Sequence, residues 1–151
     1  MLKIAHPLAG ALALVMILTF WLSTALSELF ASEAVVAMVK TSIPWGFLIL
    51  VPALAIAGAS GFGLGKTRRG DVVMRKQKRM PIIAANGILV LIPSALYLSS
   101  KAEAGAFDSG FYAVQMLELV AGAVNIILLA RNMRDGLRLS GKLRHGPAPS
   151  C

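Results

Sequence analysis

Three polar side chains interrupt the last long apolar segment of the chain, and one of them is a carboxylic acid. This segment, residues 111–131, reads FYAVQMLELVAGAVNIILLAR. Its polar residues Gln115, Glu118 and Asn125 are separated by three and seven positions, so they fall on one face of a helix, which also holds Gly122. Acids inside membrane helices tend to mark the path of an ion or a proton. Glu118 is therefore the strongest candidate in this sequence for a functional residue.

Two further polar residues interrupt other apolar segments at depths that match this face. At about 1.5 Å of rise per residue, Glu118 and Lys40 both fall in the outer half of a membrane. By the same measure Asn86 and Asn125 fall in the inner half. We therefore expect two polar layers: an outer layer of Gln115, Glu118 and Lys40, and an inner layer of Asn86 and Asn125.

Each of these residues also has a purely structural interpretation. Lys40 lies near the end of its segment, where a lysine either extends to the lipid headgroups or pairs with an acid such as Glu28 or Glu118. Buried amides such as Asn86 and Asn125 hydrogen-bond across helices and fix which helices are neighbours. The sequence leaves both interpretations open for each layer.

A histidine at the start of the first apolar segment is a candidate haem ligand. His6 and Pro7, followed by a run rich in Leu, Gly and Ala, resemble the start of the haem-bearing helices in cytochrome b561-like proteins. The resemblance covers only these few residues, and it implies a haem b with His6 as an axial ligand. The paired histidines of that family are missing from every later segment. A second ligand would have to be a methionine or His6 of a second subunit.

No motif of a known enzyme class is present in the sequence. It holds no HExxH, no GxSxG and no carboxylate cluster, so we expect neither an enzyme nor a metal site. Residues 60–67, SGFGLGKT, lack one glycine of a phosphate-binding loop and follow an apolar helix rather than a strand, so no nucleotide site is expected there. The single cysteine, Cys151, excludes a disulfide within the chain.

Four apolar segments have to position these residues. Hydrophobic residues make up 57% of the 151 residues and the mean hydropathy is +0.75. A segment of about 20 apolar residues crosses a hydrocarbon core roughly 30 Å thick. We predict an all-α membrane protein, an antiparallel bundle of four transmembrane helices in a single domain, residues 1–139. The expected helices are about 7–27, 35–59, 80–99 and 111–131, with a basic inner loop at 60–79 and a flexible basic tail at 140–151.

The basic residues set the expected orientation in the membrane. All but two of the fifteen lysines and arginines, Lys40 and Lys101, lie in the N-terminal residues, the loop 60–79 and the chain beyond residue 130. Basic residues near membrane helices stay in the cytoplasm, so both termini are predicted inside, in an inner (plasma) membrane. The formal charge of +8 is expected to meet anionic lipid headgroups at the inner loop and tail. Nucleic acid is not an expected partner, because the basic stretches lack interleaved aromatic residues.

Two functions fit these observations. The first is a small permease, or a permease subunit, that uses an intramembrane polar site around Glu118. The second is a non-catalytic subunit or assembly factor of a larger membrane complex, which could be a redox complex that holds haem b. Four helices enclose little volume, so a homo-oligomer or a partner within a membrane complex is expected in either case.

Overall fold

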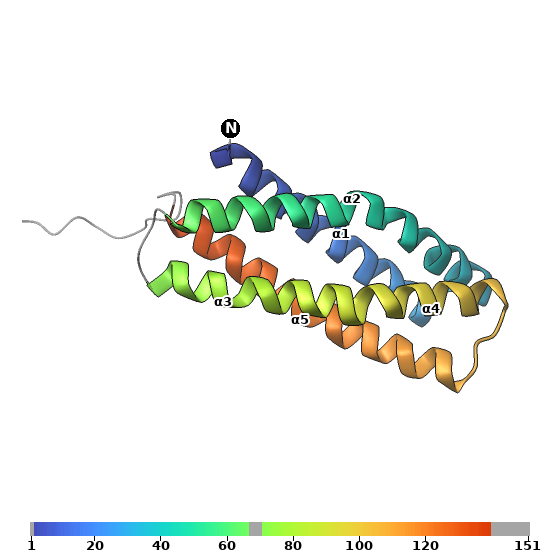
Figure 1. The fold of residues 1–151 in the computed structure, drawn as a ribbon. Coiled ribbons are helices and arrows are strands. Elements are labelled where there is room, and N and C mark those ends of the chain that lie inside the picture. The colour runs from blue at the N-terminus through green and yellow to red at the C-terminus, as the bar shows by residue number, and fades with distance from the viewer. Residues whose placement is uncertain (1, 67–70, 140–151) are drawn as a thin grey trace, which may run out of the picture.

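Helices form nearly all of this protein, which is described by a computed structural model (Figure 1). The structure describes residues 2–66 and 71–139, and no strand is present among them. The elements are α1 (Leu2–Phe30), α2 (Glu33–Lys66), α3 (Asp71–Asn86), η1 (Gly87–Leu91), α4 (Ile92–Glu103) and α5 (Ser109–Leu139). The predicted all-helical class is confirmed for the described residues.

Four helical stretches are long and apolar enough to cross a membrane, as the sequence predicts. Among the described residues they are Ala5–Phe30, Glu33–Gly61, Lys78–Glu103 and Ser109–Arg138. The third stretch combines most of α3 with η1 and α4. Large apolar side chains such as Trp45, Leu48 and Leu89 are more than two-thirds exposed. Such a surface is typical of a protein whose helices meet lipid rather than water.

The helices extend further than expected at the basic end of the chain. The region expected as a loop, 60–79, is helical apart from residues 67–70: α2 continues to Lys66 and α3 begins at Asp71. Glycine costs a helix only about 1 kcal/mol relative to alanine, and Gly61 packs closely against His6. A Cβ atom there would lie 3.0 Å from Cε1 of His6. Residues 67–70 and the tail 140–151 lie outside the described residues.

A short connection leads from α4 to α5, and two local features shape it. Gly105 has φ +63°, a left-handed conformation that glycine adopts without strain. Asp108 then caps α5, because its Oδ1 accepts a hydrogen bond of 2.9 Å from the backbone N–H of Phe111. Lys101 also reaches Asp108, with Nζ 2.6 Å from Oδ2. These contacts fix where the last transmembrane helix begins.

The transmembrane helices form a ring around a common interior. α1 packs against α2 and α5, while α4 packs against α2 and α5 from the other side (Figure 1). Within the described residues, α2 and α5 have no direct packing contact, and neither have α1 and α4. The contact of α2 with α4 is extensive, but its contact with α3 is slight. α2 and the third transmembrane stretch therefore separate along α3.

One turn of π-helix, η1, interrupts the third transmembrane stretch. The backbone N–H of Ile92 donates to the carbonyl of Gly87, five residues earlier. Pro93 follows directly, and a proline ring clashes with the carbonyl four residues before it in a regular α-helix, here Leu89. The wider turn relieves this clash. Pro52 stands inside α2 without such a change.

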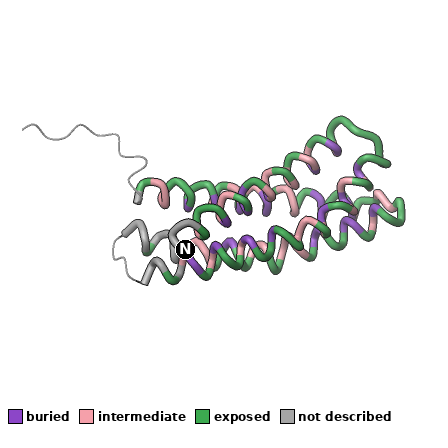
Figure 2. The backbone as a smooth tube through the Cα atoms, turned by 90° about the horizontal axis from the view of Figure 1, so that it is seen from above, coloured by how far each residue is buried: buried purple, intermediate pink, exposed green. Residues whose placement is uncertain are grey.

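Among the described residues, buried apolar side chains form two clusters rather than one continuous core. Figure 2 shows where the buried positions lie along the backbone. The larger cluster includes Ile17, Leu50 and Leu129 from three different helices. The smaller cluster lies near the α4–α5 connection and includes Leu98 and Phe111, both 0% exposed. The polar residues discussed next lie in the interior between and beside these two clusters.

Candidate functional site

The polar face of α5 turns toward the other helices. Gln115 and Asn125 are 3% and 1% exposed, and Gly122 is buried between them. Asn132, two turns beyond Asn125 on the same face, is also buried. The inward orientation that the spacing of these residues predicts is therefore confirmed.

Glu118 forms an ion pair with Lys40 in the interior. Nζ of Lys40 lies 2.5 Å from Oε2 of Glu118, and the two side chains are 0% and 13% exposed. The same ammonium group donates to Oγ1 of Thr24 at 3.4 Å. Since α2 and α5 are not packed against each other, the lysine side chain crosses the interior of the ring to reach its partner. Of the two interpretations of Lys40, the structure therefore shows the ion pair and not a side chain that extends to headgroups.

A second acid lies beside this pair. Glu28, on α1, is half-buried, and its Oε1 atom is buried without a hydrogen-bond partner in the described part of the chain. It is close enough to attract Lys40 and to repel Glu118 electrostatically. The layer thus brings together two carboxyl groups and one ammonium group, which gives it one negative charge in excess when all three are ionised.

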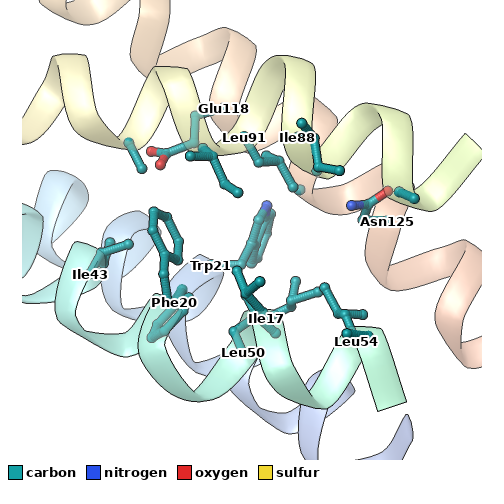
Figure 3. A pocket seen from close by; sticks show the side chains of 18 of the residues that line it. Ile17, Phe20, Trp21, Ile43, Leu50, Leu54, Ile88, Leu91, Glu118 and Asn125 are labelled. Atoms are coloured by element: carbon teal, nitrogen blue, oxygen red, sulfur yellow. The ribbon is translucent and has the colours of Figure 1, made fainter. Parts of the chain in front are cut away.

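An apolar pocket of about 390 Å³ lies next to the ion pair (Figure 3). All four transmembrane stretches contribute to its wall, which is almost entirely apolar. The polar exceptions are Glu118, Thr24 and Asn125, whereas Lys40 does not line it. Figure 3 shows Glu118 and Asn125 near opposite ends of the pocket, with Trp21 between them. The pocket therefore meets the acid of the ion pair and not the base.

Trp21 is held in the pocket wall by two contacts with α5. Its indole Nε1–H donates to the carbonyl of Leu119 at 2.9 Å. Its ring also covers Gly122, where an added Cβ would lie 2.9 Å from Cδ1 of Trp21. Because only glycine leaves room for the ring at this position, Gly122 allows α1 to approach α5 closely.

The second polar layer is a pair of amides that connects α3 and α5. Nδ2 of Asn86 donates to Oδ1 of Asn125 at 2.9 Å and to the carbonyl of Ala121 at 2.8 Å. Nδ2 of Asn125 points back toward the carbonyl of Ile83, at 3.4 Å. The structure thus brings together the two asparagines that the sequence placed at one depth. These contacts are those expected of amides that hold neighbouring helices together.

Two predicted site residues stand apart from the ion pair. Gln115 is buried, but neither polar atom of its amide has a hydrogen-bond partner among the described residues. Nδ1 of His6 lies 3.0 Å from both the carbonyl of Ala57 and Oγ of Ser60, and His6 does not line the pocket. The candidate haem ligand is therefore not brought together with Glu118, Lys40 or the asparagines.

Sequence reasoning overlooked the contribution of α1. Neither Trp21 nor Thr24 is among the predicted site residues. Yet Trp21, Thr24 and Glu28 are spaced by three and four residues, so they fall on one helical face, as the polar residues of α5 do. Trp21 also lies in the middle of an apolar segment, away from the interface where tryptophan is enriched. These two signals would have identified the face of α1 that meets the ion pair.

The arrangement can exchange the partner of a buried acid. Glu118 is held by Lys40 on one side and borders the pocket on the other, so a proton or a cation that arrives through the pocket competes with Lys40 for the same carboxylate. Glu28 is then the remaining counter-charge for Lys40. Within residues 2–66 and 71–139, no group of three or more His, Cys, Asp or Glu side chains is placed to hold a metal ion.

Comparisons with models of protein families, with curated proteins and with solved structures found no match to this chain.

Proposed function

We propose that this protein is a small permease, or a permease subunit, in which Glu118 binds and releases the proton or cation that is carried. The observation that supports this most directly is the position of Glu118, whose carboxylate borders an apolar pocket while its charge is balanced by Lys40. Ionisable groups within membrane helices are costly, and those that are kept usually serve a transport path. A purely structural pair would not need a pocket on the side of its acid.

The ion pair and Glu28 suggest how the site changes state. In the state described here, Lys40 pairs with Glu118. When a proton binds to the Glu118 carboxylate, that group becomes neutral and its attraction to Lys40 is lost. Glu28, which already interacts with Lys40 through space, then becomes the counter-ion of the lysine. The number of uncompensated charges in the interior stays small in both states, as a low-dielectric medium requires.

We further propose that the helices form an antiparallel bundle in an inner (plasma) membrane, with both termini in the cytoplasm, and that several copies associate. The basic residues at the chain termini and near the α2–α3 connection support this orientation. Cys151, the only cysteine, offers a direct check: an impermeant maleimide should label it in inverted vesicles but not in intact cells. In a Cys151→Ser background, Ser32→Cys should give the opposite pattern.

Proton movement through reconstituted protein tests the function. Proteoliposomes that contain a trapped pH indicator would be given a membrane potential with potassium and valinomycin, and the rate of internal pH change measured. We expect Glu118→Gln to lower the protein-dependent rate by about tenfold or more, since it removes the group that takes up the proton. Glu103→Gln is the matched control, because it makes the same change at an exposed acid at the end of α4.

The folded state of each variant needs its own measurement. Equal helix content and equal elution from a sizing column would show that a loss of flux is not a loss of structure. Glu118→Asp, which keeps the acid, should retain part of the rate. A rate that is the same in protein-free liposomes, wild type and Glu118→Gln would contradict the proposal and favour the role of a complex subunit, which predicts a partner protein at fixed ratio in native membranes.

A further inference from the structure

We infer that the pocket takes a lipophilic organic cation, a molecule with an apolar body and one protonated amine. This inference rests on the proposed function of Glu118 and names the class of substrate for the same site. It follows from three properties of the pocket: what its wall is made of, which charge it presents, and where it opens.

The composition of the pocket wall favours a ligand with an apolar body. The pocket of about 390 Å³ is bounded by aliphatic and aromatic side chains such as Ile17, Phe20 and Leu91. Pockets that bind small organic molecules are typically about 300–1,000 Å³, mostly apolar, with a few polar groups that fix orientation. A hydrated inorganic ion would find too few polar atoms here to replace its water. An aromatic or branched aliphatic group would pack against the apolar side chains of the wall.

The charged groups beside the pocket favour a cationic ligand. Glu118 borders the pocket, whereas Lys40 is 0% exposed and does not line it. An anion in the pocket would therefore meet the carboxylate and not the ammonium group. Glu28 is a second acid near the pair, with one carboxyl oxygen that lacks a hydrogen-bond partner in the described chain, and it adds a second negative charge when it is ionised. One further positive charge would balance the layer, and a charge-assisted hydrogen bond to Glu118 would fix its place.

The opening favours entry from the lipid. The pocket wall includes Val51 on α2 and Ile88 on η1, which are 45% and 63% exposed. In the described chain, α2 and η1 have no packing contact with each other, which leaves a gap between them at the pocket. In a membrane this gap faces acyl chains, in which a lipophilic amine is already concentrated. The substrate would thus enter sideways, with its apolar end leading.

The two tryptophans provide a binding assay that does not depend on transport. Trp21 lines the pocket, whereas Trp45 is 74% exposed on the outer surface of α2. Trp45→Phe leaves Trp21 as the only tryptophan, and Trp21→Phe leaves Trp45. The full chain in lipid nanodiscs would be titrated with para-bromophenylbutylamine, the matching alcohol and the matching carboxylate, whose bromine quenches indole fluorescence. Trp45 reports how much of each compound dissolves in the lipid, and Trp21 reports the pocket.

Saturable quenching of Trp21 by the amine is the expected result. After correction by the Trp45 signal, half-saturation should occur at a concentration at least about tenfold lower for the amine than for the alcohol, and lower still relative to the carboxylate. Glu118→Gln should remove the preference of amine over alcohol, and Glu118→Asp should keep most of it. Equal quenching by all three compounds, a preference for the carboxylate, or an amine preference that survives Glu118→Gln would each overturn the inference.

The binding assay and the flux assay separate this inference from the proposed function. Proton flux that depends on Glu118, without preferential binding of the amine, would support the proposed permease and contradict this substrate class. Preferential binding of the amine, without proton flux, would support the inferred ligand class and contradict the proposed permease.

Discussion

The two polar layers of the interior connect different pairs of helices, although both include a residue of α5. The Lys40–Glu118 pair joins α2 to α5, two helices with no direct packing in the described chain. The Asn86–Asn125 pair joins α3 to α5, which are packed neighbours. The first layer places a charged pair across the interior, and the second joins two packed helices by hydrogen bonds between neutral amides.

This difference supports the proposed division into a structural amide layer and a functional charged layer. Amides between neighbours satisfy each other and nearby carbonyls, so little is gained when a ligand replaces one partner. A charged pair that crosses an open interior has a partner that can be exchanged, and its acid borders a pocket. The comparison therefore predicts large and asymmetric effects in the charged layer, and small and symmetric effects in the amide layer.

The largest effect is expected when one member of the ion pair is removed. Lys40→Met leaves Glu118 and Glu28 close together in the interior without a counter-ion, and such a loss costs about 3–5 kcal/mol. The double variant Lys40→Met, Glu118→Leu should recover much of this loss, since it removes the unpaired charge as well. Unfolding in mixed micelles, followed by circular dichroism, measures both. A single variant as stable as the wild type would show that the pair contributes nothing.

A smaller effect is expected at the glycine that lies between the two layers. Gly122→Ala places a Cβ atom 2.9 Å from Trp21, and overpacking of this kind costs about 1–3 kcal/mol. It should also shift the fluorescence maximum of Trp21 in the Trp45→Phe background. Gly10→Ala is the matched control, because a Cβ atom there meets nothing within 4 Å. Equal stability of the two alanine variants would mean that the contact of α1 with α5 is not tight.

Substitution in the amide layer should cost less again. Asn86→Ala and Asn125→Ala are each expected to lower stability by about 1 kcal/mol, the typical strength of a hydrogen bond between membrane helices. The double variant should lose less than the sum, because the two side chains bond each other. Proton flux should continue in all three variants. Complete loss of flux in Asn125→Ala, with the fold intact, would contradict the assignment of a structural role to the amide layer.

The smallest effect is expected for the exposed pair at the α4–α5 connection. The hydrogen bond from Lys101, together with the N–H of Phe111, lowers the pKa of the Asp108 carboxyl. Asp108 therefore stabilises the fold at pH values above its unfolded pKa of about 3.9, and this contribution is lost as the pH falls through the lower pKa of the folded state. Thermal unfolding of the wild type and Asp108→Asn should differ slightly at pH 7 and converge in acid. A difference that persists below both pKa values would contradict this.

Much of this architecture could be predicted because it follows from periodicity. Four apolar segments and the polar spacing on α5 indicated both the number of membrane-length helices and the inward direction of Gln115 and Asn125. The partner of Lys40 could not be chosen in the same way. Glu28 and Glu118 lie at similar depths, and only the order of the helices around the ring decides which one a lysine on α2 reaches. Periodicity carries no information on that order.

Other features depend on local packing that the sequence does not reveal. The second helix was expected to end near residue 59, but α2 continues through Gly61 to Lys66. The π-helical turn arises before Pro93 and not at Pro52, although both prolines interrupt similar apolar runs. The pocket exists because α2 and α3 diverge, and such divergence is a property of the assembled ring.

The separation of 78 residues between Lys40 and Glu118 also bears on how the protein is made. Synthesis begins at the N-terminus, so the hairpin of α1 and α2 enters the bilayer while Glu118 has not yet been translated. Within this hairpin, Glu28 on the adjoining helix is an acid that interacts electrostatically with Lys40. We expect Glu28 to serve as a temporary counter-ion for the nascent chain until α5 arrives, completes the charge balance and closes the ring.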